Sequence, residues 1–301
     1  MSGDPLLEIQ NLNKTYGTVQ ALNGLDMQVF EGDIYGFLGP NGSGKSTTIR
    51  IILTLIFPDK GTIRFWKEDL YKRTTHTKKR LGALVEKPDF YTYLTAYKNL
   101  EILTKVGGWQ ISKKQIMETL DVVGLEEVWN KPVKTFSQGM RQRLGIAQAI
   151  LHDPDLLILD EPANGLDPNG IIDMRNLILR LNKELNKTII MSSHILKEVE
   201  LVSNRMIVIH KGKSVVEGYV NELLNKDIKV RIIVDDQEKA RNCLLKTPFS
   251  ENFSMIGNNE IEMDMNPDRI PEIIKSLVAV DVDVKSAIPV RSLEDYYLNI
   301  T

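Results

Sequence analysis

The sequence predicts an α/β fold in which parallel strands alternate with helices, followed by a smaller α+β domain. Three observations predict this. A glycine-rich loop at residues 39–47 lies between an apolar run and a helical segment. Short apolar runs alternate with helical segments as far as about residue 220. Beyond residue 222 the expected order is β-α-β-β-α-β, that of the split βαβ unit of ferredoxin-like folds.

In chain order, the first part predicts strands at residues 6–10, 22–30, 33–38, 61–66 and 81–85. The stretch at residues 70–80 is basic. We interpret it as a solvated helix face, because a nucleic-acid patch needs more positive charge and interleaved aromatic residues.

The middle of the chain predicts a helical subdomain at about residues 92–152. Two amphipathic helices, at residues 95–106 and 112–123, have Thr95 and Ser112 as N-caps, and a third is expected at 141–151. A strand at 156–159, a long helix at 168–185, a strand at 188–191 and a hairpin of 205–209 with 213–217 follow.

The last part predicts a separate domain. Strands are expected at residues 228–234, 252–256, 260–265 and 281–286, and helices at 237–245, 268–278 and 293–300. The expected boundaries are therefore 1–221 and 222–301. The second domain shows no catalytic constellation.

The composition is that of a globular protein without a dedicated nucleic-acid surface. The chain has 301 residues, of which 42% are hydrophobic and 26% charged, and its formal net charge is −2. A nucleic-acid binder usually carries a clear basic excess, so no nucleic-acid partner is expected. The single cysteine, Cys243, cannot form an internal disulfide, which fits a reducing cytosol.

Nothing in the sequence predicts a membrane span. No run approaches the roughly 20 apolar residues that cross a bilayer, and the first residues lack a basic segment followed by an apolar run. We expect a cytoplasmic protein. If it works at a membrane, another chain must supply the span.

The loop at residues 39–47 has the pattern of a phosphate-binding loop: Gly, four residues, then Gly-Lys-Ser. The glycines let backbone amides turn toward phosphate oxygens, and the following helix adds its positive end. Lys45 can reach the β- and γ-phosphates, and the Ser46 hydroxyl can hold Mg²⁺. A chance glycine-rich turn is the alternative, which the strand before and the helix after disfavour.

Two acids follow the apolar run at 156–159. Asp160, at the end of a buried strand, is expected to hold Mg²⁺ directly or through water. Glu161 is placed to take a proton from attacking water. His194 also ends an apolar strand and is expected to contact the γ-phosphate. The alternatives are an ordinary acidic turn and a structural histidine.

Together these motifs resemble the ATP-binding subunit of an ABC transporter over residues 6 to about 220. Residues 39–47 match the family's Walker A motif, residues 156–161 its Walker B motif, residues 137–140 its signature and residues 163–167 its D-loop. His194 resembles the switch histidine. The resemblance implies a P-loop NTPase fold with a mixed central sheet, an antiparallel β subdomain and a helical subdomain.

The resemblance also implies the roles of the site residues. Tyr16 resembles the aromatic residue that stacks on adenine, Asp167 belongs to the D-loop, and Glu161 and His194 are the catalytic pair. The expected ATP-binding residues are Tyr16, Gly39, Pro40, Asn41, Gly42, Ser43, Gly44, Lys45, Ser46 and Thr47.

In the family, two copies face each other head to tail and sandwich two ATP molecules. Each ATP lies between the Walker A motif of one chain and the signature of the other. The residues expected to act in trans are Ser137, Gln138, Gly139 and Met140. Gly139 lies at a helix N-terminus, whose amides can receive the γ-phosphate across the interface.

Two departures from the family pattern stand out. The signature has Gln138 and Met140 where Gly and Gln are usual, so the usual contacts of those two residues do not carry over. Glu86 stands where the family usually has glutamine. Its carboxylate either ligates Mg²⁺ or turns toward solvent. Both departures, with the appended C-terminal domain, resemble the drug, bacteriocin and lantibiotic exporter branch.

The resemblance thus predicts an ATPase, using ATP and Mg²⁺, that powers a membrane exporter from the inner face of the cell membrane. The expected partners are a second copy and an integral membrane permease. Tyr91, Tyr93 and Tyr97 either contact that permease or pack locally. The alternatives are a soluble ABC ATPase without a transport role and a regulatory ATPase. The C-terminal domain either stabilises the dimer or regulates it.

Overall fold

The computed structural model describes residues 3–72, 77, 79–85, 88–225, 228–257 and 259–291. The chain divides into two compact units, Met1–Gly218 and Tyr219–Thr301. The basic residues Arg73, His76 and Lys78, the residue Glu86 and the helix expected at 293–300 lie outside the described residues.

The first unit contains an antiparallel sheet in the order β2-β1-β4-β5. Its strands are β1 (Leu7–Tyr16), β2 (Val19–Val29), β4 (Lys60–Phe65) and β5 (Glu68–Asp69). The first two strands extend beyond the ranges expected from the apolar runs. The pairing of β1 with β2 continues through polar residues and ends at the tip of the hairpin, where Tyr16 pairs with Val19.

A second sheet carries the phosphate-binding loop. Among the described residues its strand order is β10-β9-β3-β8-β7-β6. The strands are β3 (Ile34–Leu38), β6 (Leu81–Leu84), β7 (Leu156–Asp160), β8 (Thr188–Ser193), β9 (Arg205–His210) and β10 (Lys213–Tyr219). The central strands β3 and β8 are buried along their whole length.

The direction of these strands creates the site. β3 pairs in parallel with β8 and β9, and β7 pairs in parallel with β6 and β8. The carboxyl ends of β3, β7 and β8 therefore meet at one edge of the sheet, where ligands bind in folds of this class. Lys211 and Gly212, both with positive φ, make the two-residue turn from β9 to β10, as the hairpin prediction required.

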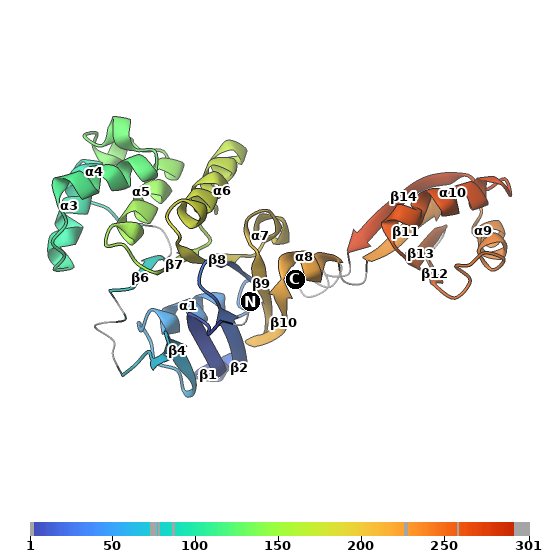
Figure 1. Cartoon of the computed structure of the whole chain (residues 1–301), viewed down its shortest axis with the longest axis horizontal. Helices are drawn as coiled ribbons and strands as arrows, with labels where there is room; N and C mark the ends of the chain where they lie inside the picture. The colour runs from blue at the N-terminus through green and yellow to red at the C-terminus, as the bar shows by residue number, and fades with distance from the viewer. Residues whose placement is uncertain are drawn as a thin grey trace. The chain divides into compact units, whose positions relative to one another are not determined.

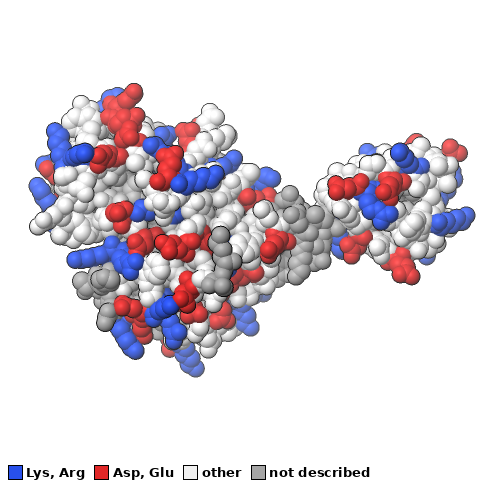
Figure 2. All heavy atoms as spheres, viewed as in Figure 1, with Lys and Arg blue, Asp and Glu red and all other residues white. Residues whose placement is uncertain are grey.

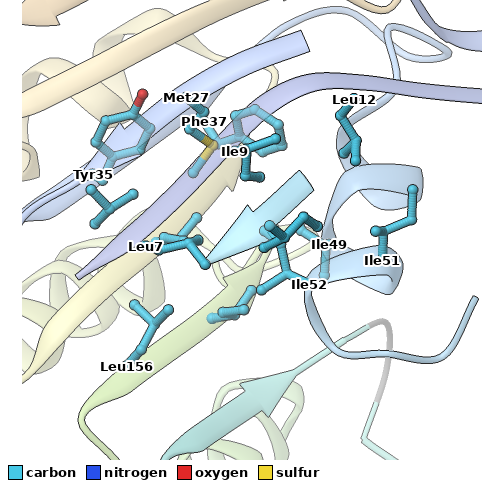
Figure 3. Close-up of a cluster of buried hydrophobic side chains, with 14 of the residues drawn as sticks. Leu7, Ile9, Leu12, Met27, Tyr35, Phe37, Ile49, Ile51, Ile52 and Leu156 are labelled. Atoms are coloured by element: carbon cyan, nitrogen blue, oxygen red, sulfur yellow. The ribbon is translucent and has the colours of Figure 1, made fainter. Parts of the chain in front are cut away.

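Helix α1 (Lys45–Ile52) packs into the core of the first unit. Figure 3 shows side chains of β1, β3 and α1 gathered in one cluster. Ile49, Ile52, Leu7 and Phe37 are fully buried in it. Burying one such side chain contributes about 1.5–3 kcal/mol. This packing therefore anchors β3 and α1, the two elements that the phosphate-binding loop connects.

Three helices form a group at one end of the first unit (Figure 1): α3 (Ala96–Val106), α4 (Lys113–Val122) and α5 (Gln138–Ile150). The 3₁₀ turns Glu126–Val128 and Val133–Thr135 connect α4 to α5. The caps predicted at Thr95 and Ser112 are confirmed, since their side chains accept from the amides of Lys98 and Gln115.

One helix boundary was wrong and one helix was not expected. α5 begins at Gln138 rather than at residue 141, because the Ser137 side chain caps it by accepting from the Met140 amide. α7 (Leu196–Val202) was not expected. The long helix α6 (Pro168–Lys183) lies where the sequence predicts it, with Asp167 as its N-cap.

The second unit has its own core. α8 (Val220–Asn225), which was not expected, precedes β11 (Ile228–Val234), α9 (Gln237–Leu244), β12 (Phe253–Ile256), β13 (Glu260–Asp264), a 3₁₀ turn (Pro267–Arg269), α10 (Ile270–Val278) and β14 (Val284–Arg291). The sheet is antiparallel in the order β12-β13-β11-β14.

Both α9 and α10 pack against this sheet through buried Leu244 and Leu277. The element order and the strand order are those of the ferredoxin-like fold, as predicted.

The surface carries charges of both signs. Figure 2 shows Lys and Arg side chains interspersed with Asp and Glu over the face in view. Among the helices that the structure describes, none has the length and hydropathy to cross a membrane.

Candidate nucleotide-binding and catalytic site

The phosphate-binding loop connects β3 to α1, and close packing explains its glycines. A Cβ at Gly39 would lie 2.5 Å from the backbone oxygen of Ile209 and 2.6 Å from Ser43 Oγ. Gly44 has a φ of 112°, a left-handed conformation, and a Cβ there would lie 2.7 Å from Leu22 Cδ2. The loop therefore requires residues without a side chain at positions 39 and 44, and only glycine meets this requirement.

Lys45 starts α1 and lies buried beneath the loop. Its Nζ donates to the carbonyl oxygens of Gly39 at 2.6 Å and Pro40 at 3.2 Å. Burial lowers the pKa of Lys45, and the negative charges of Glu161 and Asp160 oppose that shift. The hydrogen bonds of this buried cation go to neutral carbonyl oxygens and the nearest carboxylate oxygen lies 3.9 Å away, which favours a polyphosphate anion in the loop.

Asp160 and Glu161 lie at the end of β7 and are linked through a residue of β8. Ser192 Oγ donates to Asp160 Oδ1 at 2.5 Å and accepts from the Glu161 amide at 2.9 Å. Glu161 has a φ of 47°, a left-handed conformation that costs a non-glycine residue about 1–3 kcal/mol. Ser192 therefore holds Glu161 in a strained backbone conformation next to the metal-binding candidate.

The Glu161 carboxylate faces three polar groups. Its Oε1 lies 3.2 Å from His194 Nδ1 and 3.9 Å from Lys45 Nζ. Its Oε2 accepts from Asn164 Nδ2 at 3.2 Å. The structure therefore brings Lys45, Asp160, Glu161 and His194 together, as the sequence interpretation required.

Ser193, the residue before His194, holds the turn at the end of β8. Ser193 Oγ accepts from the Ile195 amide at 3.0 Å and donates to Glu198 Oε2 at 2.8 Å. These bonds orient the end of β8 toward Glu161.

A cleft of about 550 Å³ opens beside these residues. Its lining consists of polar and small residues of the loop, of β7 and its following turn, and of α5: Ser46, Gln138, Gln142, Asp160, Glu161, Asn164 and Gly165.

The residues of the cleft fit a nucleotide and a magnesium ion. Ser43 Oγ of the phosphate-binding loop and Gln142 Oε1 of the cleft are buried and have no hydrogen-bond partner among the described residues, so a ligand could satisfy them. The hydroxyl of Ser46 and the carboxylate of Asp160 are oxygen donors of the kind that Mg²⁺ prefers.

The four signature residues lie at the N-terminus of α5. Ser137 Oγ accepts from the Met140 amide at 3.2 Å, so these two groups satisfy each other. A Cβ on Gly139 would meet no atom closer than 3.9 Å, which leaves the helix end open. Gln138 Nε2 donates to the Asn164 carbonyl oxygen at 3.1 Å within the same chain.

Two further candidates, Tyr16 and Asp167, lie in other parts of the first unit. Tyr16 is 45% exposed at the tip of the β1–β2 hairpin, with Lys14 Nζ 5.5 Å from its ring centroid. Asp167 caps α6 by accepting from the Gly170 amide at 3.0 Å. Glu86 lies outside the described residues, so its two alternatives both stay open.

The three tyrosines differ in exposure. Tyr91 and Tyr93 are 53% and 70% exposed, with ring centroids 6.1 Å apart. Tyr97 packs edge-on against Trp129 at 5.8 Å. Tyr97 is thus a packing residue, whereas Tyr91 and Tyr93 present an aromatic surface.

Sequence reasoning gave Ser192 no role and placed Asn164 in the D-loop without its contact to Glu161. Each lies close in sequence to a residue that was identified, since Ser192 precedes His194 by two positions and Asn164 follows Glu161 by three. Their polar side chains beside catalytic candidates were the available signal.

Comparisons with known proteins place these features in context. The family model "ABC transporter" matches residues 22–164. The bacitracin transport ATP-binding protein BcrA of Bacillus licheniformis is 41% identical over 298 residues, which are 98% of this chain and 97% of the relative.

Two solved structures have similar folds. CbiO1 from Clostridium perfringens, part of the ABC transporter complex cbiONQ, has a TM-score of 0.68 and 26% identity, covering 82% of this chain and 97% of that chain. The dimeric ATP-binding cassette MJ0796, bound to ADP and Pi, has a TM-score of 0.63 and 25% identity, covering 71% of this chain and 98% of that chain.

Proposed function

We propose, from the premise that the chain belongs to the family of ABC transporter ATP-binding proteins, that it hydrolyses ATP with Mg²⁺ and couples this reaction to transport. The observation that carries the proposal is that Lys45 and His194 face Glu161, which lines one cleft together with Asp160.

In this proposal the loop residues bind ATP. The backbone amides of residues 39–47 other than Pro40 donate to the phosphates, the Lys45 ammonium neutralises part of their charge, and Tyr16 stacks on the adenine. Ser46 and Asp160 would hold Mg²⁺, which when bound neutralises charge on the phosphate oxygens. His194 would contact the γ-phosphate.

Glu161 would act as the general base. Its Oε2 is held by Asn164 and its Oε1 faces His194 and Lys45. The strained backbone is fixed through Ser192, and the bond from Asn164 orients the carboxylate. A positioned base of this kind contributes typically about 10²–10⁴-fold in rate.

The site would be completed by a second copy of the chain. The open N-terminus of α5 at Gly139 supports this, because its amides can receive a γ-phosphate from another molecule. The dimeric state of the MJ0796 cassette supports the same arrangement. Two equal sites then follow from two-fold symmetry.

The membrane partner and the substrate follow from the relatives. BcrA transports bacitracin by name, and CbiO1 is part of a transporter complex. We infer that this chain works on the inner face of the cell membrane with an integral membrane permease, and that the pair exports a peptide antibiotic or similar drug. Tyr91 and Tyr93 are the proposed permease contacts.

Replacing Glu161 tests the proposal. Glu161→Gln removes the base but keeps the size, so we expect turnover to fall at least about 100-fold while ATP binding remains. Glu184→Gln is the matched control, since Glu184 pairs with Arg180 at the far end of α6. Normal hydrolysis by Glu161→Gln would contradict the assignment of the base.

Coupling needs its own experiment. The chain co-expressed with a candidate permease should protect cells from bacitracin, and the Glu161→Gln variant should not. Equal protection by the wild-type chain and the Glu161→Gln variant would show that hydrolysis does not drive the export.

A further inference from the structure

We propose that Gln138 is a positioning residue for Glu161 within its own chain, which rests on the proposed function. The signature of the family implies a residue facing the partner's nucleotide at this position. The contacts of Gln138 point instead to the turn that follows β7.

The contacts form a continuous path. Gln138 Nε2 donates to the Asn164 carbonyl oxygen at 3.1 Å. The Asn164 amide donates to the Glu161 carbonyl oxygen at 3.1 Å, and its Nδ2 donates to Glu161 Oε2 at 3.2 Å. Asn164 is thus held on one side by α5 and holds the proposed general base on the other.

The turn is shaped to receive Gln138. Gly165 has a φ of 75°, and a Cβ there would lie 2.5 Å from Gln138 Nε2. A side chain at residue 165 would therefore push the amide of Gln138 away from the Asn164 carbonyl. The side-chain amide of Gln138 thus occupies the space that is left because Gly165 has no Cβ.

The path links two parts of the enzyme that the proposed function keeps separate. The N-terminus of α5 faces the nucleotide of the second copy, and Glu161 acts on the nucleotide of its own chain. A shift of α5 on contact with the partner therefore reaches Glu161 through Asn164. Without the Gln138 bond the turn loses its side-chain hydrogen bond to α5.

The test is a double-mutant cycle on the full-length protein, with kcat and the KM for ATP as readouts. Gln138→Leu removes the donor, and Asn164→Ala removes the bond to Glu161. Gln115→Leu is the matched control, because Gln115 also makes a side-chain hydrogen bond at a helix N-terminus but lies in α4.

We expect Gln138→Leu to lower kcat about threefold to tenfold, the range of one neutral hydrogen bond, with the KM for ATP changed less than about twofold. In the Asn164→Ala protein the same substitution should have a clearly smaller effect, because the bond to the Glu161 carboxylate is already lost and only the backbone bond to the Glu161 carbonyl oxygen remains. Gln115→Leu should leave kcat unchanged.

Three results would overturn the proposal. Independent, multiplicative losses in the cycle would mean that Gln138 does not act through Asn164. A raised KM with normal kcat would mean that Gln138 contacts the nucleotide. An equal loss of kcat in the Gln115 control would mean a general folding effect. A wild-type protein without ATPase activity would contradict the proposed function itself, whereas an active wild type with any of these three results contradicts only this inference.

Discussion

Ser192 is the residue whose removal tests the geometry of the catalytic carboxylates most sharply. It is fully buried, and its hydroxyl both donates to Asp160 Oδ1 and accepts from the Glu161 amide. Ser192→Ala removes both bonds at once and changes the volume of the core very little.

The magnitude follows from the two lost bonds. A buried N–H without a partner costs about 1–3 kcal/mol, and a hydrogen bond to a charged group contributes about 1.5–3 kcal/mol. We expect the free energy of unfolding to fall by about 1–4 kcal/mol, since the two losses do not add fully and release of the strain at Glu161 offsets part of them.

The effect on turnover has a separate cause. Without Ser192 the backbone of Glu161 can leave its left-handed conformation, which releases about 1–3 kcal/mol of strain and moves the carboxylate. We expect kcat to fall about tenfold to hundredfold, because a displaced general base loses much of its contribution.

The assay compares Ser192→Ala with Ser203→Ala in steady-state ATP hydrolysis and in urea unfolding. Ser203 is also buried, but its hydroxyl has no hydrogen-bond partner among the described residues. The control should keep its kcat and its stability. Normal kcat in Ser192→Ala would refute the argument that this hydroxyl positions Glu161.

Three other predictions follow from the same structure. Burial lowers the pKa of His152 below 6.5, so the unfolded chain binds a proton that the folded chain does not, and stability falls as the pH drops below about 6.5. His152→Gln should weaken this pH dependence of the free energy of unfolding, measured in urea between pH 5 and 7. An unchanged pH dependence would disprove the prediction. Gly39→Ala should abolish stabilisation by ATP in thermal unfolding, because its Cβ would strike the Ile209 backbone; retained stabilisation would contradict the close-packing argument. Tyr16→Ala should weaken ATP binding about threefold to tenfold in calorimetry while Tyr16→Phe binds normally, and equal affinities would remove the stacking role.

Patterns with a local cause were predictable from the sequence. The phosphate-binding loop, the acids that end β7 and the caps at Thr95 and Ser112 each depend on residues close together in the chain. The order of strands and helices from β11 to β14 was predictable for the same reason, because alternating apolar runs mark the strands.

Features that depend on distant partners were not predictable. Ser192 matters only because β8 lies beside β7, which puts its hydroxyl against residues 32 and 31 positions earlier. The start of α5 was missed because Ser137 was interpreted as a phosphate contact and not as a helix cap. The contact between Gln138 and the turn at Asn164 joins residues 26 positions apart and has no local sequence signal.

The central claim is that each ATP is held between the loop of one chain and the signature of another. Mixing two inactive variants tests it most directly. Lys45→Ala removes the phosphate cation, and Gly139→Asp places a carboxylate at the open end of α5, where the fold has room for it. Each variant alone should have no turnover.

In an equal mixture, half of the dimers should contain both variants and so one intact site. Because half of the dimers are mixed and each mixed dimer has one intact site of its two, the account predicts recovery of about a quarter of the wild-type turnover. A mixture as inactive as its two components would contradict the shared site and would mean that each chain holds and hydrolyses ATP alone.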